Sequence, residues 1–424
     1  MSTLSLRGRV YSLDALRAIM MLLGLVIHTV ITYSPIGYPG VWDLKAKNTN
    51  VVFELTLNWI HIFRMPVFFV AAGFFGALLF YKKGPWLMLK NRITRILLPL
   101  LVSLLILWPM VVFTFTFSMQ AIAGNADALE VAYNSILNGN FIPYKLAHLW
   151  FLYNLIIFSV FCWAVAMIIP GSNVISRLFI KVNDQILARP ILRIAVLFLV
   201  FFSCLFFNGT YYLETNTSFA LHFNLIFNYL VFYSLGWMIY RCEKLEQMNW
   251  QPVPQLILAT VLFSISMYLD QTFIPGSFLP AKQVLMSLSG TLYVFGFLAF
   301  FVRYFPSYSP TLSYIMESAY FVYLIHLPIA AFIPGLLAGA GLPLSVEYLI
   351  VLAGTVLLSF LMYHYLARNT FVGKFLNGKV FRQLQTIHMQ RMRKKCNRPE
   401  SGSRREAVGS RKPTACCLIT PLPL

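Results

Sequence analysis

The chain has 424 residues and a net charge of +19, yet only 11% of its residues are charged while 59% are hydrophobic. A soluble domain carries about 25% charged residues, so this composition excludes a soluble protein and indicates an integral membrane protein. The apolar runs are continuous and about 20 residues long, which predicts an all-α membrane protein rather than a barrel of short alternating strands.

The positive charge does not indicate a nucleic-acid partner, because no recognition motif accompanies it. Much of it lies in the C-terminal tail, and most of the rest lies in short loops on one side of the predicted membrane. The six cysteines show neither a metal-ligand spacing nor a disulfide framework. We therefore expect the lipid bilayer as a partner, no metal site and no permanently bound cofactor.

The apolar segments, taken in chain order, predict ten transmembrane helices in one bundle. They lie at residues 11–33, 57–80, 95–118, 148–169, 190–207, 221–240, 255–270, 284–302, 311–333 and 346–367. With the N-terminus in the cytoplasm, the inside loops and both termini hold 27 of the 33 lysines and arginines, whereas the outside loops hold four. This asymmetry predicts ten spans with both termini cytoplasmic. Residues 1–375 would form the membrane domain and residues 376–424 a basic cytoplasmic tail that is disordered or lies on anionic lipid.

The first segment contains two residues that are costly inside a membrane, Arg17 and His28. Eleven steps of about 100° bring the two side chains to within roughly 20° of the same helix face. At about 1.5 Å per residue they lie about 16–17 Å apart, which is close to the reach of an extended pantetheine arm. One helix face would then hold an anionic carrier near the inner leaflet and a proton-transfer group near the outer leaflet. The alternative for Arg17 is a structural ion pair with Asp14 one turn earlier.

The next two segments add further cations. Arg64 lies in the outer half of the second segment, one turn from His61. The third segment begins with Arg92 and Arg95 at positions i and i+3, which share a helix face. Together with Arg17 they would form a cationic mouth on the cytoplasmic side, suited to a polyphosphate such as the nucleotide end of coenzyme A. The alternative for the third-segment pair is ordinary flanking charge on the inner side.

Five of the seven histidines fall toward the outer side in this topology. His148 begins the fourth segment and His326 lies past the midpoint of the ninth. Each has a structural alternative, as a solvated interface residue for His148 and as a core histidine bonded to a neighbouring helix for His326. His28 is the hardest to explain structurally, because it shares a face with Arg17.

Five short motifs, in order, resemble the membrane acyltransferase-3 superfamily. They are the Arg17–His28 pair with ten residues between, FRMPVFFVAAGFFGALLF at 63–80, NRITRILLP at 91–99, HLWFLYNL at 148–155 and SAYFVYLIHLPI at 318–329. The resemblance covers about residues 10–375 and is strongest to a branch of glucan succinyltransferases. The chain departs from that branch at Ala71 and Ala72, where the branch usually has Ile-Ser, and in its long basic tail.

The resemblance implies ten core membrane helices and an acyltransferase of the bacterial inner membrane. The co-substrate would be an acyl-CoA, either succinyl-CoA or acetyl-CoA, bound from the cytoplasm by Arg17, Arg92 and Arg95. The acceptor would be a hydroxyl of a periplasmic glucan or of another envelope glycan. No cysteine or metal is needed for a direct transfer of this kind.

The resemblance also implies roles for the outer residues. His28 would take the hydroxyl proton as general base, and His326 and His148 would serve as helper acid or oxyanion donors. Arg64 would pair with the distal carboxylate of a succinyl group, because an unpaired buried anion is prohibitively costly. The alternative is that Arg64 binds backbone carbonyls at a helix break.

Two other functions remain compatible with the residues. One is O-acetylation of another envelope polysaccharide, such as a lipopolysaccharide O-antigen, by the same kind of membrane core. The other is a glycan transporter, which would also place histidines and arginines inside a helical bundle. The sequence shows no repeated halves and no midplane pair of acidic residues, which argues against proton-coupled transport.

Overall fold

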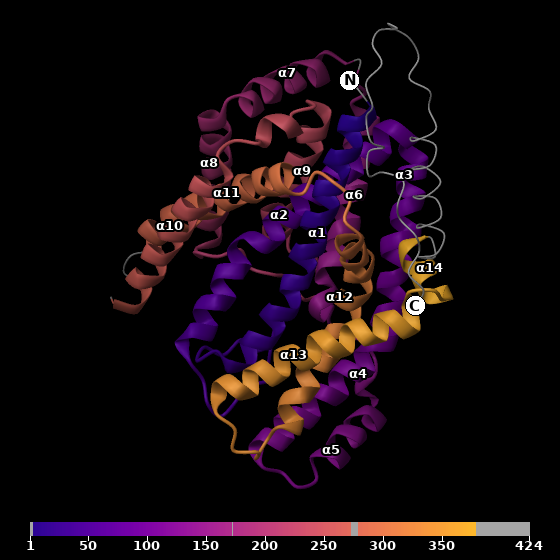
Figure 1. Ribbon diagram of the computed structural model, residues 1–424, viewed down its shortest axis with the longest axis vertical. Helices are drawn as coiled ribbons and strands as arrows, with labels where there is room; N and C mark the ends of the chain where they lie inside the picture. The colour runs from indigo at the N-terminus through magenta and orange to yellow at the C-terminus, as the bar shows by residue number, and fades with distance from the viewer. Residues whose placement is uncertain (1–2, 172, 273–278, 379–424) are drawn as a thin grey trace, which may run out of the picture. The chain divides into compact units, whose positions relative to one another are not determined.

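The computed structural model of the chain describes residues 3–171, 173–272 and 279–378, and within them the fold is α-helical without β-strands (Figure 1). The α-helices are α1 (Thr3–Val30), α2 (Val51–Lys83), α3 (Pro85–Arg92), α4 (Leu98–Ala123), α5 (Ala128–Ser135), α6 (Trp150–Ile168), α7 (Val174–Ala188), α8 (Pro190–Asn208), α9 (Phe223–Arg241), α10 (Pro252–Thr272), α11 (Leu279–Tyr304), α12 (Pro310–Leu336), α13 (Leu344–Met362) and α14 (Phe371–Asn377). Short 3-10 or π-helical turns lie at Ile31–Tyr33, Ile93–Leu97, Ile136–Asn140, Ala147–Leu149, Leu245–Met248 and Tyr363–Ala367.

Ten helical segments of the described residues are long and apolar enough to cross a membrane. Each overlaps one of the ten predicted segments, so the predicted number of spans and the all-α class are confirmed. The orientation of the termini stays a prediction, as does the division between a membrane domain and a tail at residue 375. The predicted basic tail lies outside the described residues from residue 379 onward.

The second and third spans begin earlier than predicted. Helix α2 starts at Val51, where the Asn50 side chain accepts a hydrogen bond of 2.9 Å from the Val52 N–H, and the third span starts with a proline at residue 85. The first turns of α2 contain Glu54 and Asn58, so the apolar pattern begins only after the helix has started. The hydropathy of the sequence therefore placed the start of the span six residues too late.

Helix α2 is the most completely buried of the ten spans and packs closely on α9. The two backbones touch at a pair of glycines. A Cβ added at Gly73 would fall 1.9 Å from the carbonyl oxygen of Tyr233, and one added at Gly236 would fall 1.8 Å from that of Val70. Small residues let membrane helices approach in this way, because lipid supplies no hydrophobic force to hold helices together.

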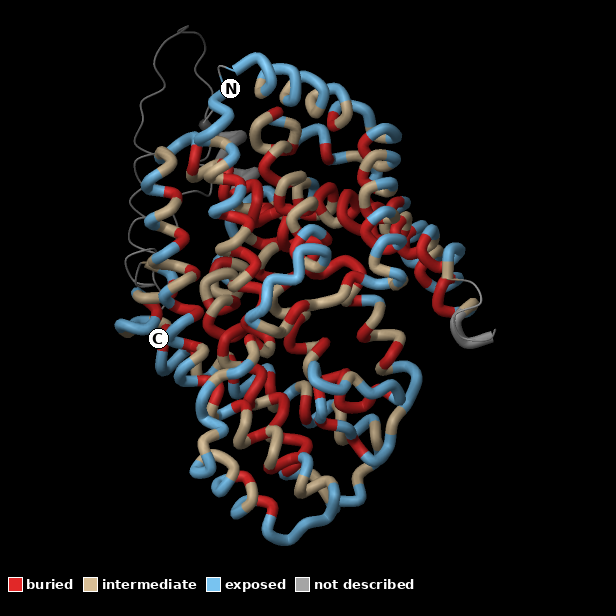
Figure 2. The backbone as a smooth tube through the Cα atoms, turned by 180° about the vertical axis from the view of Figure 1, so that it is seen from behind, coloured by how far each residue is buried: buried red, intermediate tan, exposed pale blue. Residues whose placement is uncertain are grey.

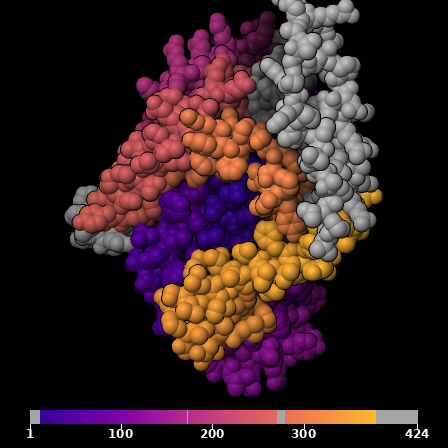
Figure 3. Space-filling model, viewed as in Figure 1, coloured from indigo at the N-terminus to yellow at the C-terminus, as the bar shows by residue number. Residues whose placement is uncertain are grey.

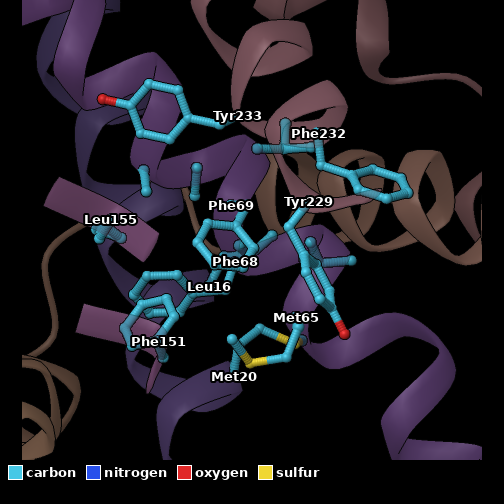
Figure 4. Packing of buried hydrophobic residues seen from close by; sticks show 14 of the residues in the cluster. Leu16, Met20, Met65, Phe68, Phe69, Phe151, Leu155, Tyr229, Phe232 and Tyr233 are labelled. Carbon is cyan, nitrogen blue, oxygen red and sulfur yellow. The ribbon is translucent and has the colours of Figure 1, made fainter. Parts of the chain in front are cut away.

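Aromatic side chains fill the space around this contact (Figure 4). Phe68 and Phe69 of α2 meet Phe151 of α6, with ring centroids 4.5 and 5.2 Å apart, and Phe69 also meets Tyr229 of α9 at 5.4 Å. The buried residues follow these central helices in Figure 2, whereas α7 is mostly exposed. The N-terminal helices, in indigo, are visible between α11 and α13 in the space-filling view of Figure 3. The helices α1 and α2, at the centre of this packing, carry three of the predicted site residues, namely Arg17, His28 and Arg64.

Candidate active site

Three histidines from three different helical segments meet at one point. The ring centroids of His28 and His326 are 5.2 Å apart, those of His148 and His326 are 5.4 Å apart, and those of His28 and His148 are 6.4 Å apart. These residues come from α1, from the turn before α6 and from α12. We call them the histidine cluster. The structure therefore brings together all three histidines that the sequence suggested for proton transfer.

Backbone carbonyls determine the tautomer of two of these imidazoles. The Nε2 atom of His148 lies 3.0 Å from the Leu324 carbonyl oxygen, and the Nδ1 atom of His326 lies 2.7 Å from the Tyr323 carbonyl oxygen. A carbonyl only accepts, so each of these nitrogens carries the hydrogen and donates it. In the neutral rings, His148 Nδ1 and His326 Nε2 are then bare.

Both bare nitrogens are buried, and neither has a hydrogen-bond partner among the described residues; the same is true of His28 Nδ1. An unpartnered buried nitrogen is costly, which suggests that a ligand or water occupies this space during function. In their neutral forms His148 and His326 present proton acceptors rather than donors, and this argues against a role as oxyanion donors. No group of His, Cys, Asp or Glu in the described part of the chain is arranged to hold a metal ion.

A tryptophan from the loop after α1 covers His28. The Trp42 ring stacks on the imidazole with centroids 5.4 Å apart and an interplanar angle of 21°. Its Nε1 donates a hydrogen bond of 3.0 Å to Thr32 Oγ1, and its other neighbour is Phe115 of α4, at 4.8 Å edge to face. Because Thr32 follows His28 by only four residues, the same helix end carries the imidazole and the anchor of its cover.

A buried carboxylate holds the beginning of this loop. Glu54, at the start of α2, accepts hydrogen bonds from Ser34 Oγ, from Tyr38 OH at 2.7 Å and from Asn58 Nδ2 at 2.5 Å. Its side chain is buried, so these donors replace the water that the charge would otherwise need. Burial, with a smaller contribution from the Glu54 carboxylate, raises the pKa of Tyr38, so the phenol stays protonated and donates. The network ties the loop that carries Trp42 to α2.

The guanidinium of Arg64 lies one helical turn below His28. Its Nε donates a hydrogen bond of 3.1 Å to the Met20 carbonyl oxygen, and its Nη2 lies close to Gly24 of α1. The group is buried and lies within electrostatic range of all three imidazoles. The contact with a backbone carbonyl agrees with the structural alternative for Arg64, but it involves only one of the three nitrogens.

Arg17 and Arg92 meet at the other end of the same α1 face. Arg17 forms an ion pair of 2.6 Å with Asp14 and lies 4.2 Å above the Phe75 ring, so the structural alternative for Arg17 is present. Arg92 is buried beside Tyr233, close enough to Arg17 for the two cations to repel each other. The guanidinium lies within hydrogen-bonding reach of the Tyr233 hydroxyl, but its Nε and Nη2 have no well-formed hydrogen bond in the described part of the chain. Two neighbouring cations with unpaired donor groups can bind an anionic ligand.

Arg95 does not join this pair. Its Nη1 donates to the carbonyl oxygens of Lys374 and Phe375, at 2.9 and 2.6 Å, and so caps the C-terminal end of α14. The predicted cationic site therefore does not include Arg95, because this residue lies in a π-helical turn, Ile93–Leu97, and its side chain bonds α14 instead of lying beside Arg17. A wider turn of this kind cannot be seen in the sequence.

Two of the three imidazoles in the histidine cluster are closed from their surroundings, whereas His28 is partly exposed. His326, Trp42 and His148 are 0%, 4% and 5% exposed. Two surface cavities, of about 440 and 400 Å³, are lined by other residues, one by α7 and the end of α9 and the other by α2 and α10. Side chains must therefore move before a substrate can reach His148 and His326, whereas His28 is partly accessible beside the Trp42 ring.

Sequence reasoning missed three residues that shape the site, namely Trp42, Glu54 and Gly24. Trp42 and Glu54 fell in a stretch assigned to an outside loop, where polar and small residues are normal. Gly24 stood inside an apolar run, and only its spacing of four residues from His28 marked it.

The chain is similar to known proteins over most of its length. A family model described as an acyltransferase domain matches residues 10–364. Proteins named glucans biosynthesis protein C, from Escherichia coli O157:H7 and from Escherichia coli strain K12, are each 26% identical to it over 345 residues. These alignments cover 76% of the chain and 83% of each relative. No solved structure shows significant similarity to the chain.

Proposed function

Because the chain belongs to the acyltransferase-3 family of membrane enzymes, we propose that it moves an acyl group, succinyl in the first instance, from cytoplasmic acyl-CoA to a hydroxyl of a periplasmic glucan. The observation that carries the proposal is the order of groups along one face of α1. Arg17 with Arg92, then Arg64, then the histidine cluster follow one another from one end of the helix to the other.

The histidine cluster supplies the proton transfer in this proposal. The acceptor oxygen attacks the thioester carbon, the carbon–sulfur bond breaks, and the hydroxyl proton passes to an imidazole nitrogen and then to the departing thiolate. His28 is the first candidate for the base, since its Nδ1 has no partner among the described residues and its ring lies beside the other two imidazoles and within electrostatic range of Arg64. His148 and His326, with bare nitrogens in the same space, extend the set of proton acceptors. General-base catalysis of this kind contributes about 10²–10⁴-fold to a rate.

The two arginines at the opposite end would hold the donor. Residues 17 and 28 lie eleven positions apart on a continuous helix, about 16–17 Å along its axis. An anionic nucleotide handle near Arg17 and Arg92 would then present its thioester near His28. Arg92 is the better candidate for binding the nucleotide, because its Nε and Nη2 are buried without a partner among the described residues. Arg95 already donates to a carbonyl oxygen of α14.

Succinyl is favoured over acetyl by Arg64. A succinyl group carries a carboxylate into the bundle, and a buried anion needs a partner. Only Nε of the Arg64 guanidinium is bonded to a described residue, and the group lies close to the imidazoles. The names of the relatives support a glucan as acceptor. O-acetylation of another envelope polysaccharide is the second candidate, because an acetyl donor would leave the same histidines in use.

A transfer assay tests the proposal. The protein in nanodiscs, which expose both faces, is given succinyl-CoA or acetyl-CoA with periplasmic glucan, and free thiol and intact glucan mass are measured. We expect thiol release that depends on the glucan, together with a glucan mass increased by succinyl groups. Acetyl increments alone would support the second candidate, and no thiol release with either donor would overturn the choice of acyl-CoA.

Two variants distinguish the loss of the proposed general base from a general effect of replacing a histidine. His28→Ala should lower transfer by about 10²-fold or more at unchanged membrane abundance. His222→Ala is the matched control, because that histidine is exposed at the start of α9 and lies outside the histidine cluster. Near-normal transfer by His28→Ala would refute the assignment of His28 as the base.

A further inference from the structure

A proline in α12 lies four residues after the carbonyl that His148 contacts. An α-helical residue normally donates its N–H to the carbonyl four positions earlier, but Pro328 has no N–H. The carbonyl left without this donor is that of Leu324. It is the same carbonyl that accepts from His148 Nε2 at 3.0 Å.

The contact has a chemical consequence at the other ring nitrogen. Because Leu324 O can only accept, His148 carries its hydrogen on Nε2 and leaves Nδ1 bare. That bare Nδ1 is buried without a partner in the described part of the chain, in the ring that lies 5.4 Å from His326. If a helical N–H also donated to the Leu324 carbonyl, His148 would have to share the acceptor that selects this tautomer, and its own hydrogen bond would weaken.

The backbone around His148 is held in place for this contact. The Tyr323 hydroxyl donates a hydrogen bond of 2.6 Å to the His148 carbonyl oxygen. Helix α12 therefore bonds both the main chain and the imidazole of His148. The preceding residue, Ala147, adopts a positive φ of 46°, which is strained for a residue with a Cβ. The strain at Ala147 supports a requirement for the orientation in which His148 bonds the Leu324 carbonyl.

We infer that Pro328 is a positioning residue for the transfer reaction: by leaving the Leu324 carbonyl free of its helical donor, it favours the tautomer of His148 in which Nε2 is protonated and Nδ1 is bare. The inference rests on the proposed function for its effect on rate, but the tautomer itself can be measured without any substrate.

The first test is a double-mutant cycle. Pro328→Ala restores the N–H, and we expect it to lower kcat by at least about tenfold with little change in the KM for acyl-CoA. In a His148→Gln background the same substitution should cost less than about twofold, because the imidazole through which it acts is gone. Equal losses in both backgrounds would overturn the inference.

A second proline in the same helix provides the control. Pro334 also interrupts α12, but the carbonyl four residues before it belongs to Ala330 and lies outside the contacts of the histidine cluster. Pro334→Ala should therefore leave kcat within about twofold of the wild type. Pro328→Gly is a second variant that restores the N–H while keeping the helix easy to bend, so a loss caused only by straightening of α12 would spare it.

The second test reads the tautomer directly. The ¹⁵N imidazole resonances of the wild-type protein, minus those of His148→Gln, should show a protonated Nε2 and a bare Nδ1 for His148. Pro328→Ala should change this pattern. A protonated Nδ1 in the wild type would overturn the inference, whatever the activity assays show. A correct tautomer in a protein without transfer activity would contradict the proposed function instead.

Discussion

The guanidinium of Arg64 lies directly against Gly24, so close that a Cβ added at residue 24 would fall 3.0 Å from Nη2 and 3.2 Å from Cζ. Gly24 is one helical turn before His28 on α1. The absence of a side chain there lets a cation from α2 reach the face of α1 that carries the imidazole. Gly24 therefore determines where the Arg64 guanidinium lies, and a substitution at either residue tests this position.

Arg64→Ala should lower succinyl transfer much more than acetyl transfer, because only the succinyl group brings a carboxylate that needs a partner. Gly24→Ala should give a smaller loss with succinyl-CoA, about tenfold, since it displaces the guanidinium without removing it. Gly354→Ala, in α13, is a matched helical control whose new Cβ meets only the flexible end of Ile333. Equal losses with both donors in Arg64→Ala would remove the argument for a carboxylate partner.

Trp42 should matter for turnover through its stack on His28. Such a ring contact is worth about 0.5–1.5 kcal/mol, so Trp42→Ala should lower kcat up to about tenfold, whereas Trp42→Phe should retain most of the rate. The control is Trp86→Ala, since Trp86 is 65% exposed on α3. If Trp42 served only as a barrier to substrate, Trp42→Ala would instead raise the rate and lower the KM for the glucan.

Gly236 should be indispensable for stability. An alanine Cβ there would fall 1.8 Å from the Val70 carbonyl oxygen, and a backbone atom cannot move aside as a side chain can. We expect Gly236→Ala to cost about 3 kcal/mol or more and to lower the melting temperature in detergent, while Gly354→Ala changes it little. A melting temperature equal to that of the wild type would show that α2 and α9 do not touch as described.

The ten spans could be predicted because each is a local property of the sequence, a continuous apolar run bounded by charge. The histidines could be assigned a depth, because the alternation of loop charge orders the segments across the membrane. That His28, His148 and His326 meet in one place could not be derived in this way, since three distant segments must pack in one arrangement. The expectation was carried by the resemblance to a family, and the distances now support it.

Other features depend on contacts that no local pattern contains. Glu54 is buried because Ser34 and Tyr38, 20 and 16 residues earlier, donate to it, and hydropathy alone assigns such an acid to the loop. Trp42 lies over His28 because its Nε1 bonds Thr32 and its ring packs on Phe115 of α4, contacts that come from separate segments. The π-helical turn before α4 likewise has no local signature, and Arg95, which lies in it, bonds the carbonyl oxygen of Lys374 in α14.

Labelling from the outside should establish the orientation. Lys47 lies in the loop between α1 and α2 and Lys83 lies at the other end of α2, and both are exposed. With the cytoplasmic N-terminus predicted from loop charge, a membrane-impermeant maleimide should label Lys47→Cys in intact cells and label Lys83→Cys only after lysis. The reverse pattern would place the donor arginines on the wrong side for cytoplasmic acyl-CoA.

A native thiol provides a pH control for that experiment. Burial, with a smaller contribution from Asp184, raises the pKa of the Cys242 thiol to about 11. The thiolate is the reactive form, so Cys242 should resist maleimide at pH 7 and react faster as the pH rises toward that pKa. The tail cysteines, which lie outside the described residues, are replaced by serine for both measurements.

Arg92 and Arg95 should respond differently to the same substitution, although they are three residues apart. Arg92 is buried with two unpaired nitrogens beside Arg17, so Arg92→Gln should raise the KM for acyl-CoA about tenfold or more with a smaller effect on kcat. Arg95 caps α14, so Arg95→Gln should lower thermal stability by about 1 kcal/mol and leave that KM within about twofold. Titrating acyl-CoA at saturating glucan measures both KM values. If both variants raised the KM equally, Arg95 would also bind the donor. Its hydrogen bonds to α14 would then have to break when the nucleotide binds.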